Sequence, residues 1–84
     1  MNSRHLKTLE QVFADPLNGN LEWRRIEALL MAVGSTRIEG SGSSVAFEKD
    51  GFKVRFHRPH PQREALRYRV ADARIFLQAI GVTP

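Results

Sequence analysis

Two of the chain's three histidines lie close together, at residues 57 and 60, inside a segment rich in arginine. Imidazole exchanges protons near neutral pH, so a histidine beside arginines is suited to proton transfer in RNA cleavage. His57 is therefore a candidate for catalysis or for binding a phosphate without chemistry. His60 stands between Pro59 and Pro61, and this rigid backbone makes it either a second catalytic candidate or an anchor of the loop.

Nothing in the sequence predicts a metal site or a bound cofactor. The chain has no cysteine, which excludes thiolate ligands and disulfides. A His-x-x-His pair without a third ligand is a weak metal signal. The Gly40-Ser41-Gly42 segment is open to two interpretations, as a source of N–H groups for a phosphate or as a flexible turn. RNA cleavage by this chain is expected to be independent of metal.

Positive charge is concentrated in the C-terminal part of the chain. Residues 53–74 hold seven Lys or Arg and two acidic residues, a net charge of +5, whereas residues 1–52 have a net charge of −1. Because the planar guanidinium suits phosphate, the expected partner is RNA, with an acidic protein as the alternative. The candidate RNA-binding residues are Lys53, Arg55, Arg58, Arg63, Arg67 and Arg69.

The hydrophobic spacing predicts three helices, over residues 4–14, 22–33 and 69–80. We expect Ser3 to cap the first helix and Asp72 to lie in the first turn of the last. Trp23 falls on the apolar stripe of the second helix, so we expect it in the core. Three strands are expected, over residues 36–39, 44–48 and 52–57. The order α-α-β-β-β-α predicts an α+β fold, a three-stranded antiparallel sheet with helices packed on one face.

The Asp50-Gly51 pair between two alternating segments is a strong hairpin signal. With these two residues in the loop, Ser44 is opposite His57, and Glu48 is opposite Lys53. The expected core face carries Val45, Phe47, Phe52, Val54 and Phe56. The expected open face carries Ser44, Ala46, Glu48, Lys53, Arg55 and His57.

Several segments between residues 23 and 82 resemble, in order and spacing, the HicA toxins of bacterial type II toxin–antitoxin systems. The helix that ends in Leu29-Leu30-Met31-Ala32-Val33-Gly34 resembles the first core helix of that family. The Gly42-Ser43-Ser44 segment resembles its Gly-Ser-His motif, and Pro59-His60 resembles its downstream Pro-His segment. Residues 70–81 resemble its closing helix.

The resemblance implies a fold like that of a double-stranded-RNA-binding domain. It also implies an endonuclease, an mRNA interferase, that blocks translation and is neutralised by a HicB-type antitoxin. The family's catalytic histidine corresponds to Ser44, and a serine is no general base near neutral pH. Since His57 is expected opposite Ser44, with Cβ atoms about 5 Å apart, its imidazole would take nearly the same place from the next strand. The catalytic candidates are Ser44, at the family position, His57 and His60.

Two other functions remain open at this point. One is a module of the same fold that binds RNA or an antitoxin without cleavage, and the other is a protein-interaction domain with an acidic partner. At 84 residues the chain is expected to form a single domain, in which residues 1–20 are a helical extension relative to the family. It has no apolar run of the length of a signal peptide or a membrane span, so we expect a cytoplasmic protein.

Overall fold

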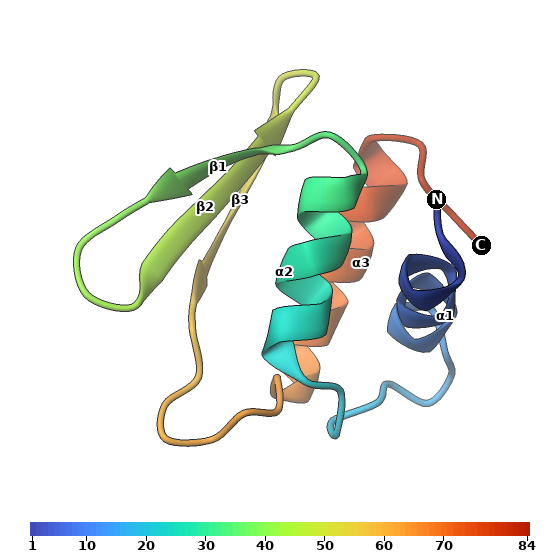
Figure 1. Ribbon diagram of the computed structural model, residues 1–84, viewed down its shortest axis with the longest axis horizontal. Helices are drawn as coiled ribbons and strands as arrows, with labels where there is room; N and C mark the ends of the chain where they lie inside the picture. The colour runs from blue at the N-terminus through green and yellow to red at the C-terminus, as the bar shows by residue number, and fades with distance from the viewer.

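The computed structural model describes all 84 residues and contains three helices and three strands. Their order is α1 (Ser3–Val12), α2 (Trp23–Ala32), β1 (Thr36–Glu39), β2 (Ser44–Lys49), β3 (Phe52–His57) and α3 (Arg67–Ala79). The predicted α-α-β-β-β-α order is therefore confirmed. Figure 1 shows the helices on one side of the sheet, with α2 and α3 in a middle layer and α1 beyond them.

The sheet is antiparallel with the order β1-β2-β3, and its register is the one predicted from the Asp50-Gly51 turn. Asp50 and Gly51 have φ angles of 54° and 84°, and a two-residue hairpin loop of type I′ needs positive φ at both positions. Ser44 pairs with His57, and Glu48 pairs with Lys53. On the other edge, Ile38 pairs with Ala46, which places Ile38 on the open face.

The core lies between the sheet and the helices and includes side chains from every helix. The Trp23 ring centroid is 4.8 Å from that of Phe56, and Phe47 lies 6.1 Å from Phe56 on the other side. Trp23 is buried, as predicted, and does not present its ring to solvent. The apolar stripe of α3, predicted from its spacing, is also buried at Val70, Ala73, Phe76 and Leu77.

The prediction that Phe52 belongs to the core is wrong, because its side chain is 47% exposed. Phe52 lies at the first position of β3, next to the hairpin turn, where it lines a shallow groove with Ile75 and Phe76 of α3 at the margin of the core. The open face is also less open than predicted. Ala46 and Ser44 are buried there because longer side chains of the two neighbouring strands flank the central strand.

Two helix starts differ from the sequence predictions. Asn2, and not Ser3, caps α1, since its side-chain oxygen accepts a hydrogen bond of 2.8 Å from the His5 N–H. The last helix begins at Arg67, two residues earlier than predicted, because the Leu66 carbonyl already accepts the N–H groups of Arg69 and of the next residue. Asp72 therefore lies in the second turn of α3, outside the region where the helix dipole favours an acid.

The N-terminal helix is attached to the rest of the fold by packing and by one arginine. Leu9 and Val12 are buried in the common core. The Arg74 guanidinium of α3 donates to the Val12 and Ala14 carbonyls at 2.9 and 2.7 Å, which satisfies carbonyls at the end of α1. The position of α1 against α2 and α3 is thereby fixed. No helix of the chain has both the length and the apolarity that a bilayer crossing requires.

Candidate nucleic-acid interface

Three side chains of β3 alternate with core residues and leave the sheet on its open face. Lys53, Arg55 and His57 are all exposed, whereas Val54 and Phe56 point toward the helices. This alternation follows directly from the period of two in a strand. Glu48, opposite Lys53, is the one acidic side chain on this face. The face therefore has a cationic edge along β3.

Arg55 is held in place by the neighbouring strand. Its Nη1 donates a hydrogen bond of 2.8 Å to the Ser44 hydroxyl. Gly40, in the turn after β1, makes this arrangement possible, because a Cβ there would lie 2.9 Å from Ser44 Oγ and 3.3 Å from Arg55 Nη1. Gly40 donates its own N–H to the Ser44 carbonyl, and Ser44 donates to the Ser41 carbonyl. Within the Gly40-Ser41-Gly42 segment, the Gly40 N–H is thus used internally and is not offered to a phosphate.

The three catalytic candidates occupy different environments. His57 is exposed and makes no hydrogen bond in the structure. Ser44, directly opposite, is only 8% exposed and is occupied by Arg55. His60 lies in the exposed loop after β3 and makes no hydrogen bond, so the loop-anchor interpretation finds no support. The geometry brings Ser44, Arg55 and His57 together on one face.

Arg58, predicted to bind RNA, is bound instead by two carboxylates of its own chain. Its Nε and Nη2 donate to Glu27 of α2 at 3.0 and 2.9 Å, and its Nη1 and Nη2 donate to Glu39 of β1 at 2.8 and 3.0 Å. Arg37 adds a hydrogen bond of 2.9 Å to Glu27. Bidentate arginine–carboxylate pairs of this kind are among the stronger polar contacts. Arg58 therefore connects α2 to the sheet.

Glu27 is the centre of this cluster and also accepts the indole N–H of Trp23 at 2.8 Å. The hydrogen bonds from Arg58 are the main cause that lowers the pKa of Glu27, and those from Trp23 and Arg37 add to the effect against the opposing effect of burial. Arg58 likewise lowers the pKa of Glu39, and the two carboxylates raise the pKa of Arg58. The cluster is electrically balanced and structural.

The other predicted arginines do not join the sheet face. Arg63 is exposed in the loop that pairs with the start of α2, where its carbonyl accepts the Trp23 N–H at 2.9 Å. Arg67 and Arg69 lie in the first turn of α3, in the helical layer. Arg69 stacks over the Tyr68 ring at 4.9 Å. The basic segment of the sequence is thus divided among three parts of the molecule.

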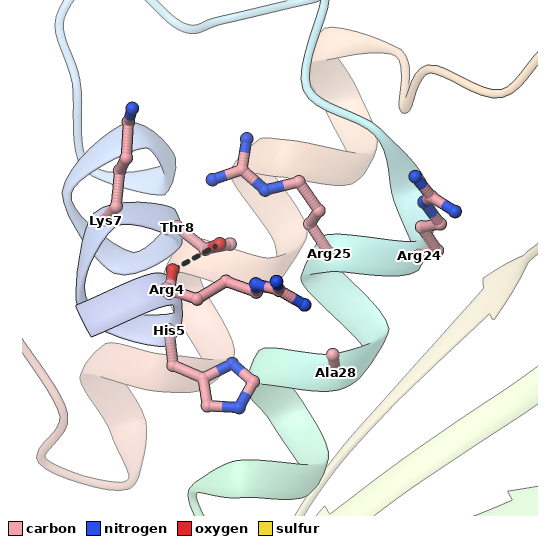
Figure 2. Close-up of a pocket in the computed structure, with 7 residues that line it drawn as sticks. All are labelled: Arg4, His5, Lys7, Thr8, Arg24, Arg25 and Ala28. Carbon is pink, nitrogen blue, oxygen red and sulfur yellow. Dashed lines mark hydrogen bonds between the residues drawn. The ribbon is translucent and has the colours of Figure 1, made fainter. Parts of the chain in front are cut away.

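Sequence reasoning missed a second cationic site, a groove of about 540 Å³ between α1 and α2. Figure 2 shows Arg4 and His5 of α1 and Arg25 of α2 pointing toward the space between the two helices, and no acidic side chain is among the lining residues. The residues that line this α1–α2 groove are Arg4, His5, Lys7, Thr8, Arg24, Arg25 and Ala28. They lie in the half of the sequence whose net charge is −1, so charge counting along the chain gave no signal.

Neither cationic surface offers an aromatic ring for base stacking. Trp23, Phe47 and Phe56 are buried, the exposed Phe52 lies on the face of β3 opposite to Lys53, and the exposed Tyr68 belongs to α3. Proteins that read single-stranded bases use such rings, whereas recognition of the phosphate backbone needs cations alone. The arrangement is therefore suited to contacts with a sugar-phosphate backbone.

No group of three or more His, Asp or Glu side chains lies together in a way that would hold a metal ion. Comparison with family models, curated proteins and solved structures gives no match for this chain.

Proposed function

We propose that this protein is a HicA-like toxin that binds mRNA on the open face of its sheet and cleaves it with His57. One observation carries the proposal: Lys53, Arg55 and His57 leave β3 on the same exposed face, with the imidazole beside a fixed guanidinium. The resemblance of several segments between residues 23 and 82 to HicA toxins supports the same function. The antiparallel sheet with helices on one side also supports the fold class that this resemblance implies.

The proposed reaction uses His57 as the base and Arg55 as the phosphate ligand. The imidazole accepts the proton of a ribose 2′-hydroxyl, and the 2′-oxygen then attacks the adjacent phosphorus. The bond from phosphorus to the 5′-oxygen breaks, that oxygen takes a proton from water as it leaves, and His57 returns the proton that it accepted to the solvent. The products are a 2′,3′-cyclic phosphate and a 5′-hydroxyl. Arg55 stabilises the charge that develops on the phosphate oxygens.

A second candidate is RNA binding without cleavage. It is favoured by the environment of the imidazole, because no carboxylate or carbonyl of the chain orients His57. Catalytic histidines are usually held by a third group. In this candidate, His57 and Arg55 only contact phosphates.

The resemblance further supports neutralisation by a HicB-type antitoxin and a cytoplasmic location, and we include both in the proposal. An antitoxin gene beside the gene for this chain is the expected genomic context. Its absence would remove one support of the toxin function.

Controlled expression in bacterial cells tests the proposal. The wild-type chain is expected to arrest growth and to produce cleaved transcripts, and His57→Ala is expected to abolish both effects. His60→Ala is the matched control, because it removes the other imidazole of the same segment. Loss of toxicity with His60→Ala alone would assign the chemistry to the loop. Intact transcripts in all three cultures, with RNA binding retained, would select the non-catalytic candidate.

A further inference from the structure

The α1–α2 groove concentrates positive charge that the chain does not neutralise. Arg4, Lys7 and Arg25 make no ion pair and no side-chain hydrogen bond. Arg24 has one ion pair, with Glu22 at 2.7 Å, but its side chain is 84% exposed. In contrast, Arg37 and Arg58 are bound by carboxylates. Three cations without a partner in the chain therefore line this one groove.

These cations occupy positions that weaken their own helices. Arg4 and His5 lie in the first turn of α1, and Arg24 and Arg25 lie in the first turn of α2; neither first turn contains an acid. The N-terminus of a helix has a partial positive charge, which favours acids and disfavours cations. An anion in the groove would relieve this repulsion.

The lining of the groove fits a phosphate backbone better than a protein. Ala28 is the one apolar side chain in it, whereas protein interfaces depend on buried aromatic and aliphatic anchors. Thr8 forms part of the floor, but its hydroxyl already donates to the Arg4 carbonyl at 3.1 Å, as Figure 2 shows. The groups left to bind a ligand are cations, and they extend from two helices along the groove. Such a surface recognises successive phosphates.

We infer that the α1–α2 groove is a second RNA-binding surface of this protein, which holds phosphates of the backbone through Arg4, Lys7 and Arg25. This inference rests on the proposed RNA-binding function and extends it to the N-terminal helix, which lies outside the resemblance to HicA toxins. Figure 1 shows α2 and α3 between α1 and the sheet, so the groove beside α1 and the open sheet face lie on different sides of the molecule. The two surfaces are therefore testable independently.

The test measures how RNA affinity depends on salt for variants of each surface. The probe is a labelled RNA duplex of about 16 base pairs, the length that a double-stranded-RNA-binding domain spans. The groove variant is Arg4→Gln, Lys7→Gln and Arg25→Gln together, and the sheet variant is Lys53→Gln with Arg55→Gln. Each lost phosphate contact lowers the slope of log affinity against log salt by about 1. The groove variant is expected to lose about 2 to 3 units of slope and at least about tenfold in affinity.

The matched control is Lys49→Gln, which removes one charge outside both surfaces and is compared with Lys7→Gln alone. Lys49 has no ion pair, as Lys7 has none. Lys7→Gln is expected to lower the slope by about 1 and Lys49→Gln to leave it unchanged. Thermal unfolding shows that each variant is folded.

The outcomes separate the groove from the proposed function. If only the sheet variant loses affinity, the groove inference is overturned and the sheet remains the RNA site. If only the groove variant loses affinity, the groove is the RNA site and the proposed role of the sheet fails. A groove variant that keeps its RNA slope but no longer binds poly-glutamate would assign the groove to an acidic protein, against the inference.

Discussion

Ser44 and His57 lie directly opposite each other in the ladder between β2 and β3. Their side chains lie on the same open face, but they differ in solvent exposure and in hydrogen bonding. The Ser44 hydroxyl is nearly buried and bound by Arg55, whereas the His57 imidazole is exposed and unbound. RNA on this face would therefore meet the imidazole and not the hydroxyl. The Ser44 hydroxyl holds the Arg55 guanidinium in place.

His57→Ala should separate catalysis from binding. Loss of a general base reduces a rate by a factor of about 100 to 10,000, while one lost contact among several changes the dissociation constant far less. We expect the cleavage rate of a labelled RNA to fall by at least about 100-fold, with the dissociation constant changed by less than about threefold. Gln78→Ala, on the exposed side of α3 and outside both proposed RNA surfaces, is the control. An equal loss of rate and affinity would make His57 a binding residue only.

Gly40→Ala should disturb the open face from its edge. The new Cβ would lie 2.9 Å from Ser44 Oγ and 3.3 Å from Arg55 Nη1, so the pair must shift. Overpacking of this kind costs about 1 to 3 kcal/mol of unfolding free energy, and RNA affinity should fall with the displacement of Arg55. Urea denaturation and RNA titration measure the two effects. Ser41→Ala, in the same turn, is expected to change neither, and a loss there equal to that of Gly40→Ala would refute this role of Gly40.

Glu27 should make the stability of the fold dependent on acid. The hydrogen bonds from Arg58 hold the pKa of Glu27 below its ordinary value in the folded state. The stability that this carboxylate contributes is therefore complete above the pKa of the unfolded chain, and it is lost as the pH falls through the lower, folded pKa. Urea unfolding from pH 6 down to pH 3 measures the loss.

Glu27→Gln should remove most of this acid dependence and should lower the unfolding free energy at neutral pH by about 2 kcal/mol or more, because two arginines lose a charged partner. The Glu27 side chain is only 14% exposed, so solvent replaces the lost contacts poorly. Glu10→Gln, on the exposed part of α1, is the control and should leave the acid profile unchanged. An acid profile of Glu27→Gln identical to that of the wild type would contradict the assigned role.

Removing charge from the α1–α2 groove should stabilise the fold while it weakens RNA binding. Arg4 and Arg25 lie in first turns, where the helix dipole opposes a cation by about 0.3 to 1 kcal/mol. Glutamine has nearly the same helix propensity as arginine, so Arg4→Gln and Arg25→Gln isolate the charge effect. We expect each to raise the urea midpoint slightly. A lower midpoint for both would mean that these arginines serve the fold.

Much of the fold follows from local signals in the sequence. The Asp50-Gly51 turn determines one register, and the alternation on either side of it places Val45 and Phe56 inward and Arg55 outward. The sequence pattern was less informative where an element ends. Phe52 has the alternation of a core residue, but it lines a shallow groove beside α3 and stays 47% exposed, and no local pattern gives how far a helix covers the end of a strand.

The candidate site was predictable only where it lies on one hairpin. Arg58 was predicted to bind RNA because it belongs to the basic segment. Its ion pairs could not be predicted, since its partners Glu27 and Glu39 are 31 and 19 residues away in the sequence. The α1–α2 groove was missed for the same reason, since only the packing of α1 against α2 places Arg4 and Arg25 at the same groove. The one available signal was the presence of cations, without acids, in the first turns of two helices.

The central claim is that RNA lies against the cationic edge of the open sheet face. Titration of the isotope-labelled protein with an RNA duplex, followed by backbone amide chemical shifts, tests it most directly. The account predicts the largest shifts at Lys53, Arg55 and His57, with a second group at residues 4–7. Shifts confined to the apolar groove of Phe52 and Ile75, or no shifts at low salt, would contradict it.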